Sequence, residues 1–111
     1  MAVLINQEEG LKRMMNNKKL YVKLLSKFKT STNLDELRDS IAAQDYEKAQ
    51  IAAHTLKGIS GNLSLMALYE QSISIESQIK NRSLDESAIT ALTDCFNDTM
   101  RVIDEVIAVN G

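Results

Sequence analysis

Apolar side chains recur every three or four residues along nearly the whole chain, and short polar stretches interrupt the repeat. This spacing places the apolar side chains on one face of an α-helix. The pattern predicts six helices, over residues from about 6 to 15, 18 to 29, 33 to 43, 45 to 62, 65 to 80 and 83 to 109. The chain has no proline and is rich in Leu, Ile, Ala, Lys and Glu, which favours an all-α fold.

Residues that favour helix ends stand at these boundaries. A short polar side chain before a helix can accept a hydrogen bond from an N–H group of the first turn, and a Glu three residues later completes a capping box. The predicted N-caps are Asn6, Asn33 with Glu36, Asp45, and Ser83 with Glu86, and the predicted left-handed end of the fourth helix is Gly61–Asn62.

The connections between the predicted helices are short, so consecutive long helices should lie antiparallel. We therefore expect an antiparallel four-helix bundle that starts at the second or third helix, with an additional short N-terminal helix as a lid. The small Ser72 should let the fifth helix lie close to the alanine-rich face of the fourth. A length of 111 residues without a repeat or linker predicts a single domain over residues 1–111.

The fourth predicted helix has two unlike faces. Projection at 100° per residue gathers small and aliphatic residues, from Ala49 to Leu63, into an inward stripe. The single histidine of the chain, His54, falls on the opposite, open face. The open face also carries Glu47, Gln50, Ile51, Lys57, Gly58 and Gly61.

The surroundings of His54 suit a nucleophile. A glycine inside a helix costs about 1 kcal/mol relative to alanine, so Gly58 and Gly61 call for a reason. Both lie beside His54, where they are expected to leave steric clearance around the ring. Lys57, three residues after His54, can meet a phosphoryl group carried on the imidazole.

These residues resemble the histidine phosphotransfer (HPt) domains of bacterial phosphorelays. The family signature is a histidine followed by an aliphatic residue, a lysine and a glycine, and then a stretch of small residues. Ser64 departs from the pattern, because relatives often carry glycine there. The resemblance rests on His54, Leu56, Lys57, Gly58 and the stretch 60–63, and more widely on Asp45–Tyr46, on residues 9–14 and on residues 20–28.

The resemblance implies a phosphocarrier and not an enzyme. His54 would accept a phosphoryl group from a receiver-domain aspartate, on the ring nitrogen farther from the main chain, and pass it to another receiver. The receiver would supply Mg²⁺, so no cofactor or metal is expected in this chain. Lys57 and Gln50 would support the phosphoryl group, and Glu47 and Ile51 would contact the partner. For Ile51, contact with the first helix is an equal alternative.

Composition argues against other function classes. The net charge of −2, with few aromatic residues, disfavours nucleic-acid binding. No apolar run has membrane-spanning length and the start lacks a signal-peptide pattern, so we expect a cytoplasmic protein. One histidine and one cysteine cannot form a histidine-rich or cysteine-pair zinc site, and Cys95 is expected to be a buried, reduced thiol. The lysines of residues 18–29 are expected to be a solvated helix face.

Two other interpretations stay open. A sensor kinase also carries its phospho-accepting histidine on a helical bundle, but that bundle is a dimer, whereas we expect a monomer. A non-catalytic adaptor of the same fold would dock receiver or kinase domains without phosphotransfer. The sequence Lys57–Gly58 after the histidine favours the phosphocarrier over both.

Overall fold

The protein is all-α in the computed structural model, which describes residues 5–110. The expected domain of residues 1–111 reaches beyond this range, so residues 1–4 and 111 lie outside the described residues. The helices are α1 (Gln7–Arg13), α2 (Lys18–Phe28), α3 (Asn33–Ala42), α4 (Tyr46–Asn62), α5 (Met66–Lys80) and α6 (Glu86–Asn110). Each predicted helix is present, with ends shifted by at most three residues.

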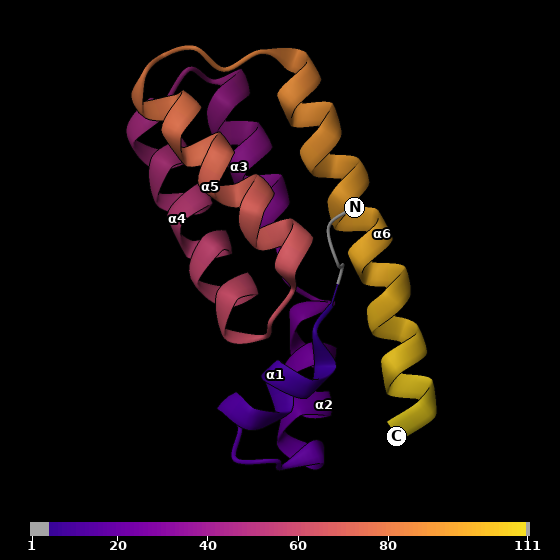
Figure 1. Ribbon diagram of the computed structural model, residues 1–111. Helices are drawn as coiled ribbons and strands as arrows, with labels where there is room; N and C mark the ends of the chain where they lie inside the picture. Colours follow the sequence, from indigo (N-terminus) through magenta and orange to yellow (C-terminus); the bar gives the residue numbers. More distant parts are fainter. Residues whose placement is uncertain (1–4, 111) are drawn as a thin grey trace.

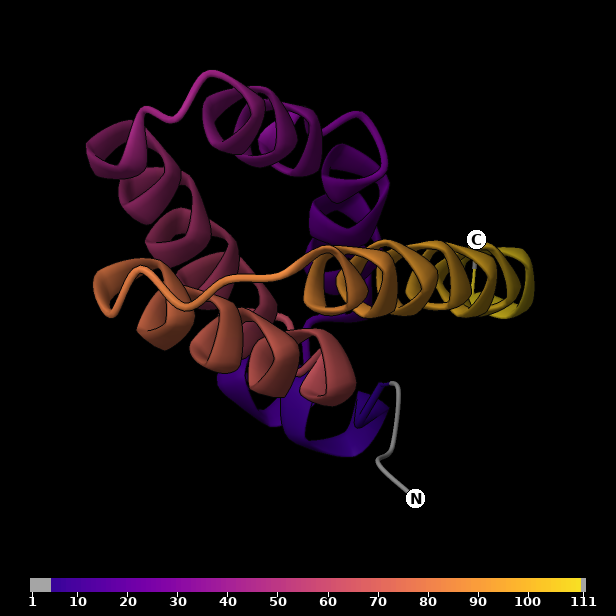
Figure 2. The same cartoon turned by 90° about the horizontal axis from the view of Figure 1, so that it is seen from above.

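The helices form an antiparallel bundle in which α2 and α3 share one position. In Figure 1, α3 continues above α2 in the same direction, and α4, α5 and α6 follow with alternating directions. Seen from above in Figure 2, these helices surround a common centre. With 25 residues, α6 is about 37 Å long, close to the 40 Å long dimension of the molecule. It can therefore flank both α2 and the helices at the other end.

Two of the predicted N-caps are confirmed. The Asn6 side chain accepts a hydrogen bond from the backbone N–H of Glu9, and the Asp45 side chain accepts one from Lys48, each at 3.1 Å. The cap of α4 matters most, because it sets where the helix that carries His54 begins.

The other two predicted caps are wrong. Asn33 is the first residue of α3, whose N-cap is Thr32. The Ser83 hydroxyl reaches back to the carbonyl of Gln78, and Asp85 instead accepts the bond from Ala88 N–H at 2.9 Å. Both errors have one cause: several polar residues stand in succession at these boundaries, and the spacing of a capping box does not select among them.

The core lies where the apolar stripes meet. The largest contact between helices is that of α4 with α5. Small side chains make it close: Ala49, Ala53, Ser60 and Ser72 are fully buried. The Ser72 hydroxyl donates to the carbonyl of Leu68, so its burial leaves no donor unpaired. The expected close approach of α5 to the alanine-rich face of α4 is confirmed.

The short helix α1 is held against the end of the α4–α5 pair. The backbone N–H of Asn6 donates to the carbonyl of Ser64, and the Tyr21 hydroxyl donates to the carbonyl of Leu63 at 2.8 Å. Burial raises the pKa of Tyr21 to about 12, so the hydroxyl keeps the proton that it donates. A Cβ atom at Gly10 would lie 2.6 Å from the Tyr21 hydroxyl. Glycine is therefore needed for α1 to approach α2.

Cys95 is half-buried rather than buried. It lies beside the apolar stripe of α6 and not within it, because Leu92, Phe96, Thr99 and Ile103 take the inward positions. Partial burial raises the pKa of the Cys95 thiol.

Candidate functional site

His54 lies on the outer face of α4, as predicted. Its side chain is 69% exposed, while Ala53 beside it is fully buried. The alternation follows from the helical period, since the small residues of α4 face α5 and leave the next residue outward. His54 is thus accessible to a partner and contributes little to the core.

Glu76 of α5 joins His54 and Lys57. One oxygen, Oε2, lies 2.9 Å from His54 Nδ1, and the other, Oε1, accepts a hydrogen bond of 2.9 Å from Lys57 Nζ. The Glu76 side chain is only 10% exposed. The hydrogen bond from Lys57 is the main cause that lowers the pKa of Glu76, and the bond with His54 adds to it. Glu76 is therefore an ionised, largely buried carboxylate under the ring.

This arrangement selects one tautomer of the neutral imidazole. An ionised carboxylate only accepts hydrogen bonds, so Nδ1 of His54 must carry the proton in the 2.9 Å contact. The lone pair is then on Nε2, the nitrogen farther from the main chain. Nε2 can act as a nucleophile while Glu76 holds the orientation of the ring.

Glu76 is the site residue that sequence analysis missed. Its signal is its position four residues after Ser72 and eight after Leu68, on a row of α5 that is otherwise buried. A carboxylate on such a row needs a cationic partner nearby. The sequence alone did not indicate that this partner is Lys57, which lies 19 residues earlier, on α4.

A solvent-open hollow of about 480 Å³ adjoins His54 between α4 and α5. Glu47, Gln50 and Ile51 line it together with His54, so the structure brings these four predicted residues together. Glu76 and two residues not singled out from the sequence, Thr55 and Lys80, complete the lining.

Ile51 is 62% exposed, as a docking contact requires. It borders hollows formed with residues of α3 and of α5. The α1 residues Glu9 and Arg13 instead line a hollow with Gly58 and Gly61, in the other half of α4. The alternative of an Ile51 contact with the first helix therefore finds no support.

The two glycines of α4 differ. Apart from its chain neighbours and the backbone of its own helix turn, a Cβ atom at Gly58 would have no atom within 4 Å, so the space beside this position is open. At Gly61 a Cβ atom would lie 3.0 Å from Cε1 of Tyr69. The expectation of open space at Gly61 is wrong: the Tyr69 ring of α5 fills it.

α4 ends at Asn62, as predicted, but the left-handed residue at this end is Ser64, with φ of 56°, and not Gly61 or Asn62. Glycine adopts this conformation more easily than serine does, so the serine at this position has a backbone cost. The Ser64 hydroxyl is buried without a hydrogen-bond partner among the described residues.

Within residues 5–110, no helix is long and apolar enough to span a membrane. In the same range, no three His, Cys, Asp or Glu side chains are grouped as a metal site would need. The absence of a metal or cofactor requirement stays a prediction.

Comparison with known proteins gives one match. The family model for the Hpt domain matches residues 24–102, which include His54, Lys57 and Glu76. No curated protein and no solved structure matches the chain. Hpt domains are helical bundles that carry phosphoryl groups on histidine in phosphorelays, and they interact with receiver domains. With about 70% of its length matched and with this helical fold, the chain belongs to the Hpt domain family.

Proposed function

We propose that His54 accepts a phosphoryl group from the phospho-aspartate of one receiver domain and delivers it to the aspartate of another. The observation that carries this proposal is the contact of Glu76 with Nδ1, which leaves Nε2 unprotonated on an exposed ring. A cytoplasmic monomer is part of the proposal.

In the forward step, the lone pair of Nε2 attacks phosphorus and forms a P–N bond. The bond between phosphorus and the aspartyl oxygen breaks, and the aspartate leaves as a carboxylate. The ring keeps its proton on Nδ1 and gains positive charge, which the carboxylate of Glu76 stabilises. Transfer to the second receiver reverses these changes. The receiver domain supplies Mg²⁺ for the phosphoryl oxygens.

Lys57 supports the site in two ways in this proposal. Its ammonium holds Glu76 in place, and because Lys57 and His54 bind the two oxygens of the same carboxylate, the ammonium can screen a phosphoryl group on the ring. Gln50 lines the hollow beside the ring and is available to the phosphoryl oxygens. Gly58 leaves room for the receiver, and Ile51 and Glu47 contact it.

The His54→Gln variant tests the central claim. We expect it to lose acid-labile, base-stable phosphate after incubation with a phosphorylated receiver, while helicity and receiver binding stay near those of the unmodified protein. Helicity should persist because the His54 side chain is exposed. Labelling of this variant would contradict the assignment.

The same measurements address the alternatives. If the protein is an adaptor, the wild-type sequence would bind receivers without gaining acid-labile phosphate. The histidine-bearing helix pair of a sensor kinase would be a dimer, whereas we expect a mass near 12.4 kDa in solution.

A further inference from the structure

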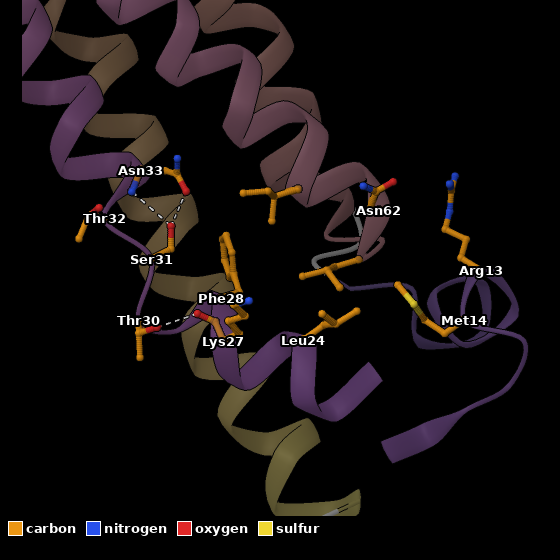
Figure 3. A pocket seen from close by; sticks show the side chains of 12 residues that line it. Arg13, Met14, Leu24, Lys27, Phe28, Thr30, Ser31, Thr32, Asn33 and Asn62 are labelled. Carbon is orange, nitrogen blue, oxygen red and sulfur yellow. Dashed lines mark hydrogen bonds between the residues drawn. The ribbon is translucent and has the colours of Figure 1, made fainter. Parts of the chain in front are cut away.

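A second and larger cavity lies away from His54, between α2, the end of α1, the α2–α3 connection and the C-terminal half of α4 (Figure 3). Its volume is about 750 Å³, within the usual range of small-molecule sites. It shares no lining residue with the hollow at His54. The cavity and the hollow at His54 are therefore separate sites.

The cavity combines an apolar interior with a polar edge. In Figure 3 the side chains of Met14, Leu24 and Phe28 point toward its middle, and Ser31 and Asn33 lie at one end. Arg13 and Asn62 lie at the other end. The site is open to solvent, so an apolar body could lie against the first group of side chains while a polar head meets the edge.

The charge at this cavity is positive. Of the described residues that line it, two are basic and none is acidic. Arg13 already pairs with Glu9 at 3.1 Å. Lys27 has no acidic side chain within ion-pairing distance among the described residues, whereas the neighbouring Lys29 pairs with Asp104. Lys27 is therefore the cation available to an anion.

The surroundings of Lys27 strengthen this charge. Lys19, Lys23 and Lys27 stand four residues apart on one exposed row of α2, and the like charge of Lys23, one turn away, repels that of Lys27. α2 contains no acidic residue to offset them. An anion bound at the Lys27 end of the row would reduce this repulsion as well as pair with the nearest ammonium.

We propose that this cavity binds small amphipathic carboxylates, molecules with a compact apolar body and one anionic head. The apolar body would lie against Met14, Leu24 and Phe28, and the carboxylate would lie at the rim near Lys27. This inference does not depend on phosphotransfer by His54, and its test measures binding alone.

The test is a titration of the full-length, uniformly ¹⁵N-labelled protein with sodium octanoate, followed by backbone amide shifts. Butanoate and octanol serve as matched probes, since the first has a shorter apolar body and the second has no charge. We expect saturable shifts confined to residues around the cavity. Butanoate should bind at least about ten-fold more weakly, because several CH₂ groups are removed from the apolar contact.

The variant Lys27→Ala should raise the dissociation constant for octanoate about two- to five-fold, the range of a solvent-exposed ion pair. Lys19→Ala is the matched control: it removes the same charge from the same row about 12 Å away, beyond the screening length in physiological salt. It should leave the constant unchanged within a factor of about 1.5.

Three outcomes would overturn the proposal. Shifts that do not saturate, or that spread over the whole surface, would exclude a site. Octanol binding as tightly as octanoate would exclude recognition of the carboxylate. If Lys19→Ala and Lys27→Ala weakened octanoate binding equally, the anion would be attracted diffusely to α2 and not bound at Lys27.

Discussion

At the scale of single residues, the site depends on one carboxylate that two cation-capable side chains share. Glu76 is largely buried, and its two oxygens are each 2.9 Å from a nitrogen, one of His54 and one of Lys57. Removing either partner would leave a buried charge less compensated. The orientation of the nucleophile and the stability of this α4–α5 contact therefore rest on the same group.

Glu76 should make stability depend on pH. Its pKa in the folded protein lies below the ordinary value of 4.5. A lowered pKa contributes stability above the ordinary value, and this stability is lost as pH falls through the folded-state pKa. We expect the free energy of unfolding to fall more steeply in the unmodified protein than in Glu76→Gln as the pH is lowered from about 5.5 through the folded-state pKa.

Urea unfolding at several pH values measures this difference. Glu70→Gln, an exposed change in the same helix, is the control and should keep the steep dependence of the unmodified protein. Identical pH profiles for the unmodified protein and Glu76→Gln would show that Glu76 gains nothing from its partners on folding.

The two glycines of α4 should respond differently to alanine. Gly58→Ala meets no other residue, so it should raise the free energy of unfolding by up to about 1 kcal/mol while slowing phosphotransfer beside His54. Gly61→Ala should gain less, because its Cβ atom lies 3.0 Å from Tyr69. Unfolding and transfer rates on the same samples provide the comparison. An equal gain in both variants, or unimpaired transfer in Gly58→Ala, would refute the distinction.

At the scale of helices, the ends of the elements carry unusual backbone conformations. Non-glycine residues with positive φ follow several helices: Met15, Asn16, Gln44, Ser64 and Arg82. Side chains make this conformation unfavourable by about 1 kcal/mol. The turns therefore depend on the packing of the helices that they connect.

Replacing Ser64 by glycine tests this dependence. Ser64→Gly should raise the free energy of unfolding by up to about 1 kcal/mol, since it relieves the φ of 56° and removes the buried, unpartnered hydroxyl. Gln44→Gly, at φ of 57° on an exposed residue, is the matched control for the backbone effect alone and should gain less. Thermal or urea unfolding of both would decide. Destabilisation in Ser64→Gly with a gain in Gln44→Gly would assign the serine side chain a packing role.

At the scale of the whole molecule, α6 joins the two ends of the bundle. Its N-terminal part flanks α5, and its middle meets the end of α2, where the rings of Phe28 and Phe96 lie 5.7 Å apart. Lys29 and Asp104 add an ion pair beside this contact. The α2 segment and the α4–α5 pair should therefore unfold together.

A double-mutant cycle on Phe28 and Phe96 measures this coupling. We expect a coupling energy of about 0.5–1.5 kcal/mol between Phe28→Leu and Phe96→Leu, as for other aromatic pairs at this separation. Each variant should keep a single unfolding transition by circular dichroism. Two separate transitions in the unmodified protein would instead show that α2 is not part of the same cooperative unit.

The helices and the outward face of α4 could be predicted from the sequence alone. The spacing of apolar residues within a segment indicates which of its side chains are buried, and this spacing can be read without knowledge of the other segments. This spacing placed His54, Lys57 and Gly58 on the surface. The caps Asn6 and Asp45 were predictable for the same reason, since a cap bonds only to its own first turn.

How the segments come together to complete the site depends on contacts between distant helices. Glu76 reaches His54 across 22 residues of sequence, and Tyr69 fills the space at Gly61, because α5 packs against α4 at close range. The placement of α2 and α3 one after the other along the bundle likewise depends on the length of α6. Such contacts result from the packing of segments that are distant in sequence. They cannot be predicted from the apolar period of one segment.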